Sequence, residues 1–190
     1  GMIVLSPRAV ERLATYKPER PLPKIFRMTS GGKLGEGLFA GETINTPSML
    51  AVEDCIDALK WAEQIGGVPA LLKRVDANYR AIEGWVAKSG WAAFLCDDAA
   101  ARSKTSVCLK ITDPWFLQKD DAARQDFIKA MTRKIDKEGA GYDIAGHSKA
   151  PAGLRIWCGA TVEAADVEKL LPWLDWAFAA TKAEAQKEAA

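Results

Sequence analysis

The sequence is poor in the residues that build metal sites and disulfide frameworks. The chain of 190 residues has a single histidine, His147, and four cysteines, no two of which form a C-x-x-C pair. One histidine cannot complete the usual Cys/His zinc sets, and cysteines spread this far apart are typical of reduced core thiols. A chain of this length buries roughly 70% of the surface that its unfolded form exposes. We therefore expect no metal site and a core that needs no disulfide.

Excess charge and long apolar runs are absent too. The 26 Lys and Arg residues balance 25 Asp and Glu residues, which leaves a formal net charge of +1. This balance argues against nucleic acid or an anionic membrane as a partner of the whole surface. No apolar run approaches the 18 or so residues of a membrane span, and Met2–Leu5 is too short for a signal peptide. These absences predict a cytoplasmic chain without membrane or nucleic-acid partners.

Apolar residues recur at helix and strand spacings along the whole chain, which predicts an α+β fold. The expected elements are a buried strand at 2–5, a helix at 7–16 capped by Ser6, a glycine-rich hairpin at 25–39, helices at 47–66 and 68–90, a strand at 105–111, a turn at Asp113–Pro114, a helix at 120–138, a strand at 154–158 and a last helix capped by Thr161. The pattern before residue 67 is typical of the trailing edge of an α/β sheet. We therefore expect two domains, the remnant of a larger domain at 1–67 and a small α+β domain at 68–190.

Asn45 and Thr46 form the first candidate site, because with Pro47 they open a predicted helix. Backbone N–H groups at a helix start, together with an amide and a hydroxyl, can hold an anion such as a phosphate. Plain capping of the helix explains the same residues, since capping needs only one of the two side chains. A nucleotide site at this position is a third interpretation, which predicts binding of ATP.

Arg155 forms the second candidate site, on a strand whose other face carries Leu154 and Ile156. An arginine fork fixed on a rigid strand suits bidentate capture of a carboxylate. His147 and Lys149, in the loop before the strand, add two more groups that can contact an anion. The alternative is an exposed strand arginine beside an idle loop histidine.

Four stretches of the sequence resemble the C-terminal half of the phosphoserine aminotransferases, fold-type-I enzymes that depend on pyridoxal phosphate. These stretches are Val4–Val10, Leu22–Arg27, Gly41–Ser48 and Ala150–Trp157. The resemblance covers residues 2–190. It implies the small C-terminal domain of such an enzyme together with the trailing part of its large α/β domain.

The resemblance also implies a reaction and a site. The reaction moves the amino group of glutamate to 3-phosphohydroxypyruvate, which gives phosphoserine and 2-oxoglutarate in serine biosynthesis. In a homodimer, Asn45 and Thr46 would contact the cofactor phosphate of the neighbouring subunit, and Arg155 would bind the substrate α-carboxylate. His147 and Lys149 would hold the substrate's phosphate or distal carboxylate. The family has a His-Arg pair there, so Lys149 would serve as a point charge without the bidentate fork.

The same resemblance implies that the chain is catalytically incomplete. The lysine that forms the Schiff base, the acid that pairs with the pyridine nitrogen and the aromatic residue that stacks on the ring all precede residue 1 in the family. We therefore expect no catalytic residue in this chain and no activity from it alone. A second hypothesis is a non-catalytic α+β module, derived from an aminotransferase small domain, that binds a carboxylate or another protein.

Overall fold

The structure is a computed structural model, and it describes residues 3–147 and 150–188. Two compact units divide the chain, one comprising Gly1–Lys60 and the other Trp61–Ala190. Each unit has its own local contacts.

The first unit consists of short elements joined by turns. Its elements are α1 (Pro7–Thr15), η1 (Lys24–Phe26), β1 (Thr29–Ser30), β2 (Lys33–Leu34), η2 (Glu36–Leu38) and the start of α2 (Met49–Gln64). As predicted, Ser6 caps α1, since its Oγ accepts a hydrogen bond from the Ala9 N–H at 3.2 Å. The predicted hairpin is present but short. Gly31 and Gly32 connect its strands at φ +58° and +78°, values that glycine adopts without a steric penalty.

The buried strand expected at 2–5 is wrong for residues 3–5, which form no strand. Val4 is 95% exposed, although an apolar run of this kind is typical of a strand buried on both faces. A strand needs a neighbour that accepts and donates its backbone hydrogen bonds, and no described residue pairs with this segment. None of the described residues of the first unit is buried.

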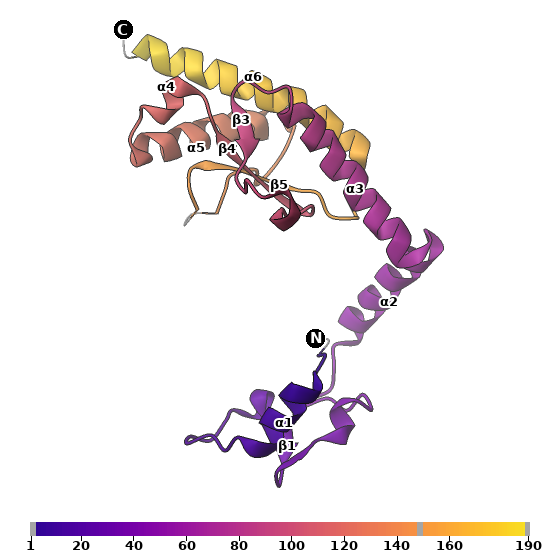
Figure 1. Cartoon of the computed structure of the whole chain (residues 1–190). Coiled ribbons are helices and arrows are strands. Elements are labelled where there is room, and N and C mark those ends of the chain that lie inside the picture. The colour runs from indigo at the N-terminus through magenta and orange to yellow at the C-terminus, as the bar shows by residue number, and fades with distance from the viewer. Residues whose placement is uncertain (1–2, 148–149, 189–190) are drawn as a thin grey trace. The chain divides into compact units, whose positions relative to one another are not determined.

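The second unit contains the hydrophobic core. Its elements are α3 (Gly67–Val86), β3 (Ala92–Phe94), η3 (Ala99–Ala101), β4 (Ser106–Ile111), α4 (Pro114–Leu117), α5 (Asp121–Lys137), β5 (Gly153–Trp157) and α6 (Ala164–Glu188). The strands form an antiparallel sheet in the order β3-β4-β5. Helices α3, α5 and α6 lie on one side of this sheet (Figure 1).

Alternation along the strands decides which face of the sheet is buried. Val107, Leu109 and Ile111 of β4 are buried toward the helices, as the period of two predicted. Leu154 pairs with Leu109, and Ile156 pairs with Val107, so the apolar side chains of β5 join the same layer. The side chains between them point to the other face of the sheet, which no described helix of this unit covers.

Three details of the second unit differ from the predicted elements. The strand β3 was not predicted, because three residues are too few to show a period. The expected turn at Asp113–Pro114 begins the one-turn helix α4, in which the Asp113 carboxylate accepts hydrogen bonds from the N–H groups of Trp115 and Phe116. The last helix begins at Ala164, three residues after the predicted cap Thr161.

The cysteines are only in part the core thiols that we expected. Cys158 is buried, and burial raises the pKa of its thiol to about 11. Cys55, Cys96 and Cys108 are exposed, so the prediction is wrong for these three. Cys108 is exposed because it lies between Val107 and Leu109 on the uncovered face of the sheet.

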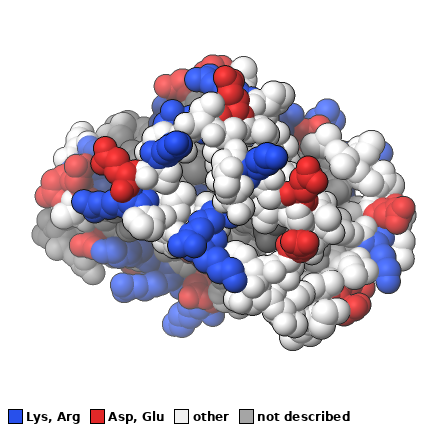
Figure 2. Space-filling view, turned by 90° about the horizontal axis from the view of Figure 1, so that it is seen from below, with Lys and Arg blue, Asp and Glu red and all other residues white. Residues whose placement is uncertain are grey.

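The described helices include none that is both long and apolar enough to cross a membrane. Figure 2 shows Lys and Arg residues and Asp and Glu residues interspersed among uncharged residues over the face that it presents.

Asp113 couples the stability of the second unit to pH. Burial raises the pKa of this carboxyl, but hydrogen bonds from Lys182 (2.7 Å) and from two backbone N–H groups outweigh burial and lower it. A depressed pKa adds stability above the unfolded-state pKa of about 3.9, and this stability is lost as pH falls through the folded pKa. We expect Asp113→Asn to lower the free energy of unfolding by about 1 kcal/mol at pH 7 and to make its decline below pH 4 shallower. Urea unfolding at pH 3, 5 and 7 measures both effects, and parallel pH curves for the two proteins would contradict the assignment.

Candidate functional site

Arg155 occupies the middle of β5, on the uncovered face of the sheet. Its neighbours Leu154 and Ile156 are buried on the helix side, so alternation places the Arg155 side chain on the opposite face, where it is 39% exposed. Across the sheet Arg155 lies opposite Cys108 of β4. The backbone of Arg155 is held on both sides, because its N–H also donates to the Ile144 carbonyl at 2.7 Å.

Arg155 lines a cavity of about 470 Å³. Its walls combine the uncovered sheet face with the segment before β5 and one residue of α6. The lining residues are Ser106, Gly141, Tyr142, Asp143, Ile144, Arg155, Ile156, Trp157 and Leu170. The exposed rings of Tyr142 and Trp157 give this cavity aromatic walls next to a fixed positive charge.

Asp143 is the charged partner of Arg155 in this cavity. Its Oδ2 accepts a hydrogen bond from Arg155 Nη2 at 2.9 Å. Asp143 was not predicted as a site residue, because no spacing or motif marks it. Asp143 meets Arg155 only because the Gly141–Gly146 segment folds back along β5.

That segment brings the candidate loop residues to the same edge of the sheet. Ala145 pairs with Leu154, and the Gly146 N–H donates to the Gly153 carbonyl at 3.0 Å. His147 follows directly and is exposed; its carbonyl accepts a hydrogen bond from the Ala150 N–H at 2.8 Å. The structure therefore places His147 and Arg155 on adjacent chain segments. Lys149 lies outside the residues that the structure describes.

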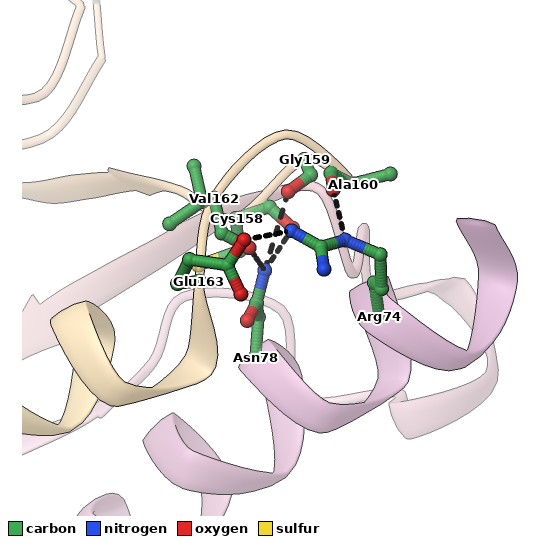
Figure 3. Close-up of polar contacts among 7 residues, drawn as sticks. All are labelled: Arg74, Asn78, Cys158, Gly159, Ala160, Val162 and Glu163. Atoms are coloured by element: carbon green, nitrogen blue, oxygen red, sulfur yellow. Dashed lines mark hydrogen bonds and ion pairs between the residues drawn. The ribbon is translucent and has the colours of Figure 1, made fainter. Parts of the chain in front are cut away.

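Two residues of α3 hold the turn that follows β5. Asn78 is fully buried, and its Nδ2 donates to the carbonyls of Cys158, Gly159 and Val162 at 3.0–3.2 Å (Figure 3). Arg74 adds a hydrogen bond to the Ala160 carbonyl at 2.6 Å. These contacts fix the C-terminal end of the strand that carries Arg155.

This contact between α3 and the turn was not predicted, although the sequence contains a signal for it. Asn78 interrupts the apolar stripe of Val75, Tyr79 and Ile82, and a polar residue on a buried stripe needs hydrogen-bond partners.

Asn45 and Thr46 lie in the first unit, and Pro47 and Ser48 separate them from α2, which begins at Met49 rather than at the predicted residue 47. Both residues are exposed. The side chain that caps α2 is that of Ser48, whose Oγ accepts a hydrogen bond from the Ala51 N–H at 3.4 Å. Within the described part of the chain, the amide of Asn45 and the hydroxyl of Thr46 make no hydrogen bond, so helix capping does not occupy them.

Comparison with known proteins identifies relatives for the chain. No protein-family model matches it. A phosphoserine aminotransferase of Methanosarcina barkeri is 48% identical over 178 residues, and one of Methanosarcina mazei is 47% identical over the same length. The chain is a relative of phosphoserine aminotransferases over 94% of its length. The resemblance expected from the four sequence stretches is thereby confirmed.

The chain spans less than half of these phosphoserine aminotransferases, since the match covers 45% of each. Two solved structures share its fold. A phosphoserine aminotransferase from Bacillus circulans subsp. alkalophilus matches 72% of this chain and 34% of its own, with a TM-score of 0.59 and 20% identity. A phosphoserine aminotransferase whose Schiff base was studied for radiation damage matches 74% of this chain and 36% of its own, with a TM-score of 0.61 and 16% identity. The predicted α+β fold class, that of the C-terminal part of such enzymes, is confirmed.

Proposed function

We propose that this chain is the C-terminal, substrate-binding portion of a cytoplasmic, homodimeric phosphoserine transaminase of serine biosynthesis. The intact enzyme transfers the amino group of glutamate to 3-phosphohydroxypyruvate, which yields phosphoserine and 2-oxoglutarate. The observation that carries the proposal is the placement of Arg155. Its guanidinium lies on a strand held on both edges and faces a 470 Å³ cavity, in a chain 48% identical to a phosphoserine aminotransferase.

The proposed role of Arg155 is to bind the α-carboxylate that all of these substrates share. A guanidinium presents parallel N–H groups that match the two oxygens of a carboxylate. Because the strand fixes the arginine, the bound carboxylate fixes the orientation of the substrate Cα. His147 and Lys149 would bind the phosphate or the distal carboxylate, which distinguishes these substrates from simple amino acids.

Asn45 and Thr46 fit the phosphate of pyridoxal phosphate. Their donors are exposed, and Ser48 already caps α2, so an anion at this helix start would meet an amide, a hydroxyl and the positive end of the helix. We propose that these two residues hold the cofactor phosphate of a neighbouring subunit. When bound, the cofactor supplies the electron sink for the substrate Cα.

The proposed contribution of this chain is binding and orientation. The proton transfer needs a lysine base and a group that pairs with the pyridine nitrogen, and we propose that both come from parts of the enzyme outside this chain. The chain alone is then expected to bind substrate carboxylates without transamination.

Binding and turnover test the proposal separately. Calorimetric titration with O-phospho-L-serine and L-glutamate is expected to show binding that Arg155→Ala weakens by about tenfold to a hundredfold, because charge-assisted hydrogen bonds are lost. Arg155→Lys retains the charge without the fork and is expected to fall between the two. Arg133→Ala removes an exposed arginine of α5 and serves as the control. Equal affinities of wild type and Arg155→Ala would refute the carboxylate role.

The turnover arm mixes the wild-type chain with pyridoxal phosphate, glutamate and 3-phosphohydroxypyruvate and measures 2-oxoglutarate. No 2-oxoglutarate is expected, and steady formation would show that the chain is catalytically complete. Binding of carboxylates by the chain without any affinity for pyridoxal phosphate would favour the non-catalytic module instead.

A further inference from the structure

Asp143 has an unusual backbone. Its φ of +53° makes it the one residue other than glycine with a positive φ in the described ranges 3–147 and 150–188. L-residues rarely adopt this left-handed conformation, although aspartate and asparagine tolerate it better than most, and such outliers cluster at functional sites. Here Asp143 lines the same cavity as Arg155, and its carboxylate accepts a hydrogen bond from Arg155 Nη2.

The contact between Asp143 and Arg155 leaves part of the guanidinium available. Asp143 accepts one hydrogen bond from Arg155 Nη2. Among the described residues, it is the one hydrogen-bond partner of the guanidinium. A guanidinium carries five N–H groups, two of them on Nη2. Whichever Nη2 hydrogen Asp143 accepts, one complete two-donor edge of Arg155 remains for a second carboxylate.

The high exposure of the Asp143 side chain allows it to move away from Arg155. Its side chain is 84% exposed, against 39% for Arg155, so the aspartate can move into solvent while the arginine stays on its strand. A ligand carboxylate on the remaining edge would lie close to the Asp143 carboxylate, and like charges at this distance repel each other. Asp143 therefore opposes the binding of any carboxylate to Arg155.

We propose that Asp143 is an internal counter-ion of the substrate site, a positioning residue that holds Arg155 in the empty state and competes with incoming carboxylates. The proposal rests on the proposed function of Arg155 as a carboxylate-binding residue. It follows that Asp143 lowers the affinity of the site for every carboxylate. Ligands with further anchoring groups offset this loss, whereas small monocarboxylates bind poorly.

The test follows the Arg155 Nε–Hε signal in ¹⁵N NMR spectra of the full chain, assigned with Arg155→Lys. Acetate serves as the monocarboxylate probe and L-glutamate as the ligand with further groups. Asp143→Asn and Asp143→Gly both tolerate a positive φ, and the glycine variant adds no amide donor. Asp97→Asn is the matched control, since Asp97 pairs with Lys110 at 2.7 Å on the same uncovered sheet face and the change removes the same charge.

Both Asp143 variants are expected to bind acetate about two- to fivefold more tightly than wild type, which is the range of an exposed ion pair. Asp97→Asn is expected to match wild type. If all proteins bind with equal affinity, or if the Asp143 variants bind more weakly, the counter-ion proposal is wrong while the role of Arg155 stands. If no protein shifts the Arg155 signal with either probe, the proposed function of Arg155 fails and the counter-ion proposal fails with it.

Discussion

Asn78→Asp is expected to lower the free energy of unfolding by about 3 to 5 kcal/mol at pH 7. The substitution keeps the shape of the side chain but replaces the donor Nδ2 by an oxygen. Three backbone carbonyls, of Cys158, Gly159 and Val162, then lose their donor and face a charge at a site with no exposed surface. Few single substitutions combine an unpaired buried charge with the loss of one donor to three carbonyls, although the Gly159 carbonyl keeps its hydrogen bond from the Val162 N–H.

The effect of Asn78→Asp is also expected to depend on pH. Burial raises the pKa of the introduced carboxyl above its unfolded value of about 3.9, so the folded variant binds more protons than the unfolded one. The stability of the variant therefore falls as pH rises from about 4 toward 7. At low pH the protonated carboxyl donates one hydrogen bond and recovers part of the loss.

Urea unfolding followed by tryptophan fluorescence measures the effect, since the chain has seven tryptophans. Asn45→Asp makes the same chemical change at an exposed position and is expected to leave the unfolding midpoint within experimental error. A midpoint for Asn78→Asp equal to that of wild type at pH 7 would show that the turn after β5 does not depend on Asn78.

The sequence predicted the parts of the fold that repeat a pattern. Alternation in β4 and β5 assigned the buried face of the sheet, and from it the exposed placement of Arg155. Three-residue β3 carries no period, and the strand expected at 2–5 depends on a neighbour that the described residues do not supply. Prediction failed where an element depends on a partner distant in sequence.

The same distinction between local and distant signals applies to the residues of the candidate site. Arg155 was found because its residue type and its strand position can both be read locally. Asp143 was missed because its contact with Arg155 depends on a backbone conformation and on the pairing of the Ile144–Gly146 segment with β5. Likewise, Ser48 rather than Asn45 or Thr46 caps α2, because α2 begins at Met49, two residues after the predicted start at Pro47.

Gly153→Ala is expected to destabilise the second unit by about 3 kcal/mol and to disturb Arg155 as well. Gly153 is buried at the start of β5, opposite Lys110. A Cβ at this position would overlap the carbonyl oxygen of Leu109 in β4, and a backbone atom of a paired strand cannot turn aside. The two strands must separate at this end, which shifts the residues that follow, including Arg155.

Gly84→Ala separates this steric effect from the general effect of removing a glycine. Gly84 lies within α3, and a Cβ there meets no atom within 4 Å. Alanine at this helix position is expected to raise the free energy of unfolding by about 0.5 to 1 kcal/mol. The two glycine-to-alanine substitutions should therefore change the free energy of unfolding in opposite directions. Urea unfolding measures the stability, and titration with L-glutamate measures the proposed site. A Gly153→Ala chain as stable as wild type would show that β4 and β5 yield at this point, and the rigid support that we infer for Arg155 would then be absent.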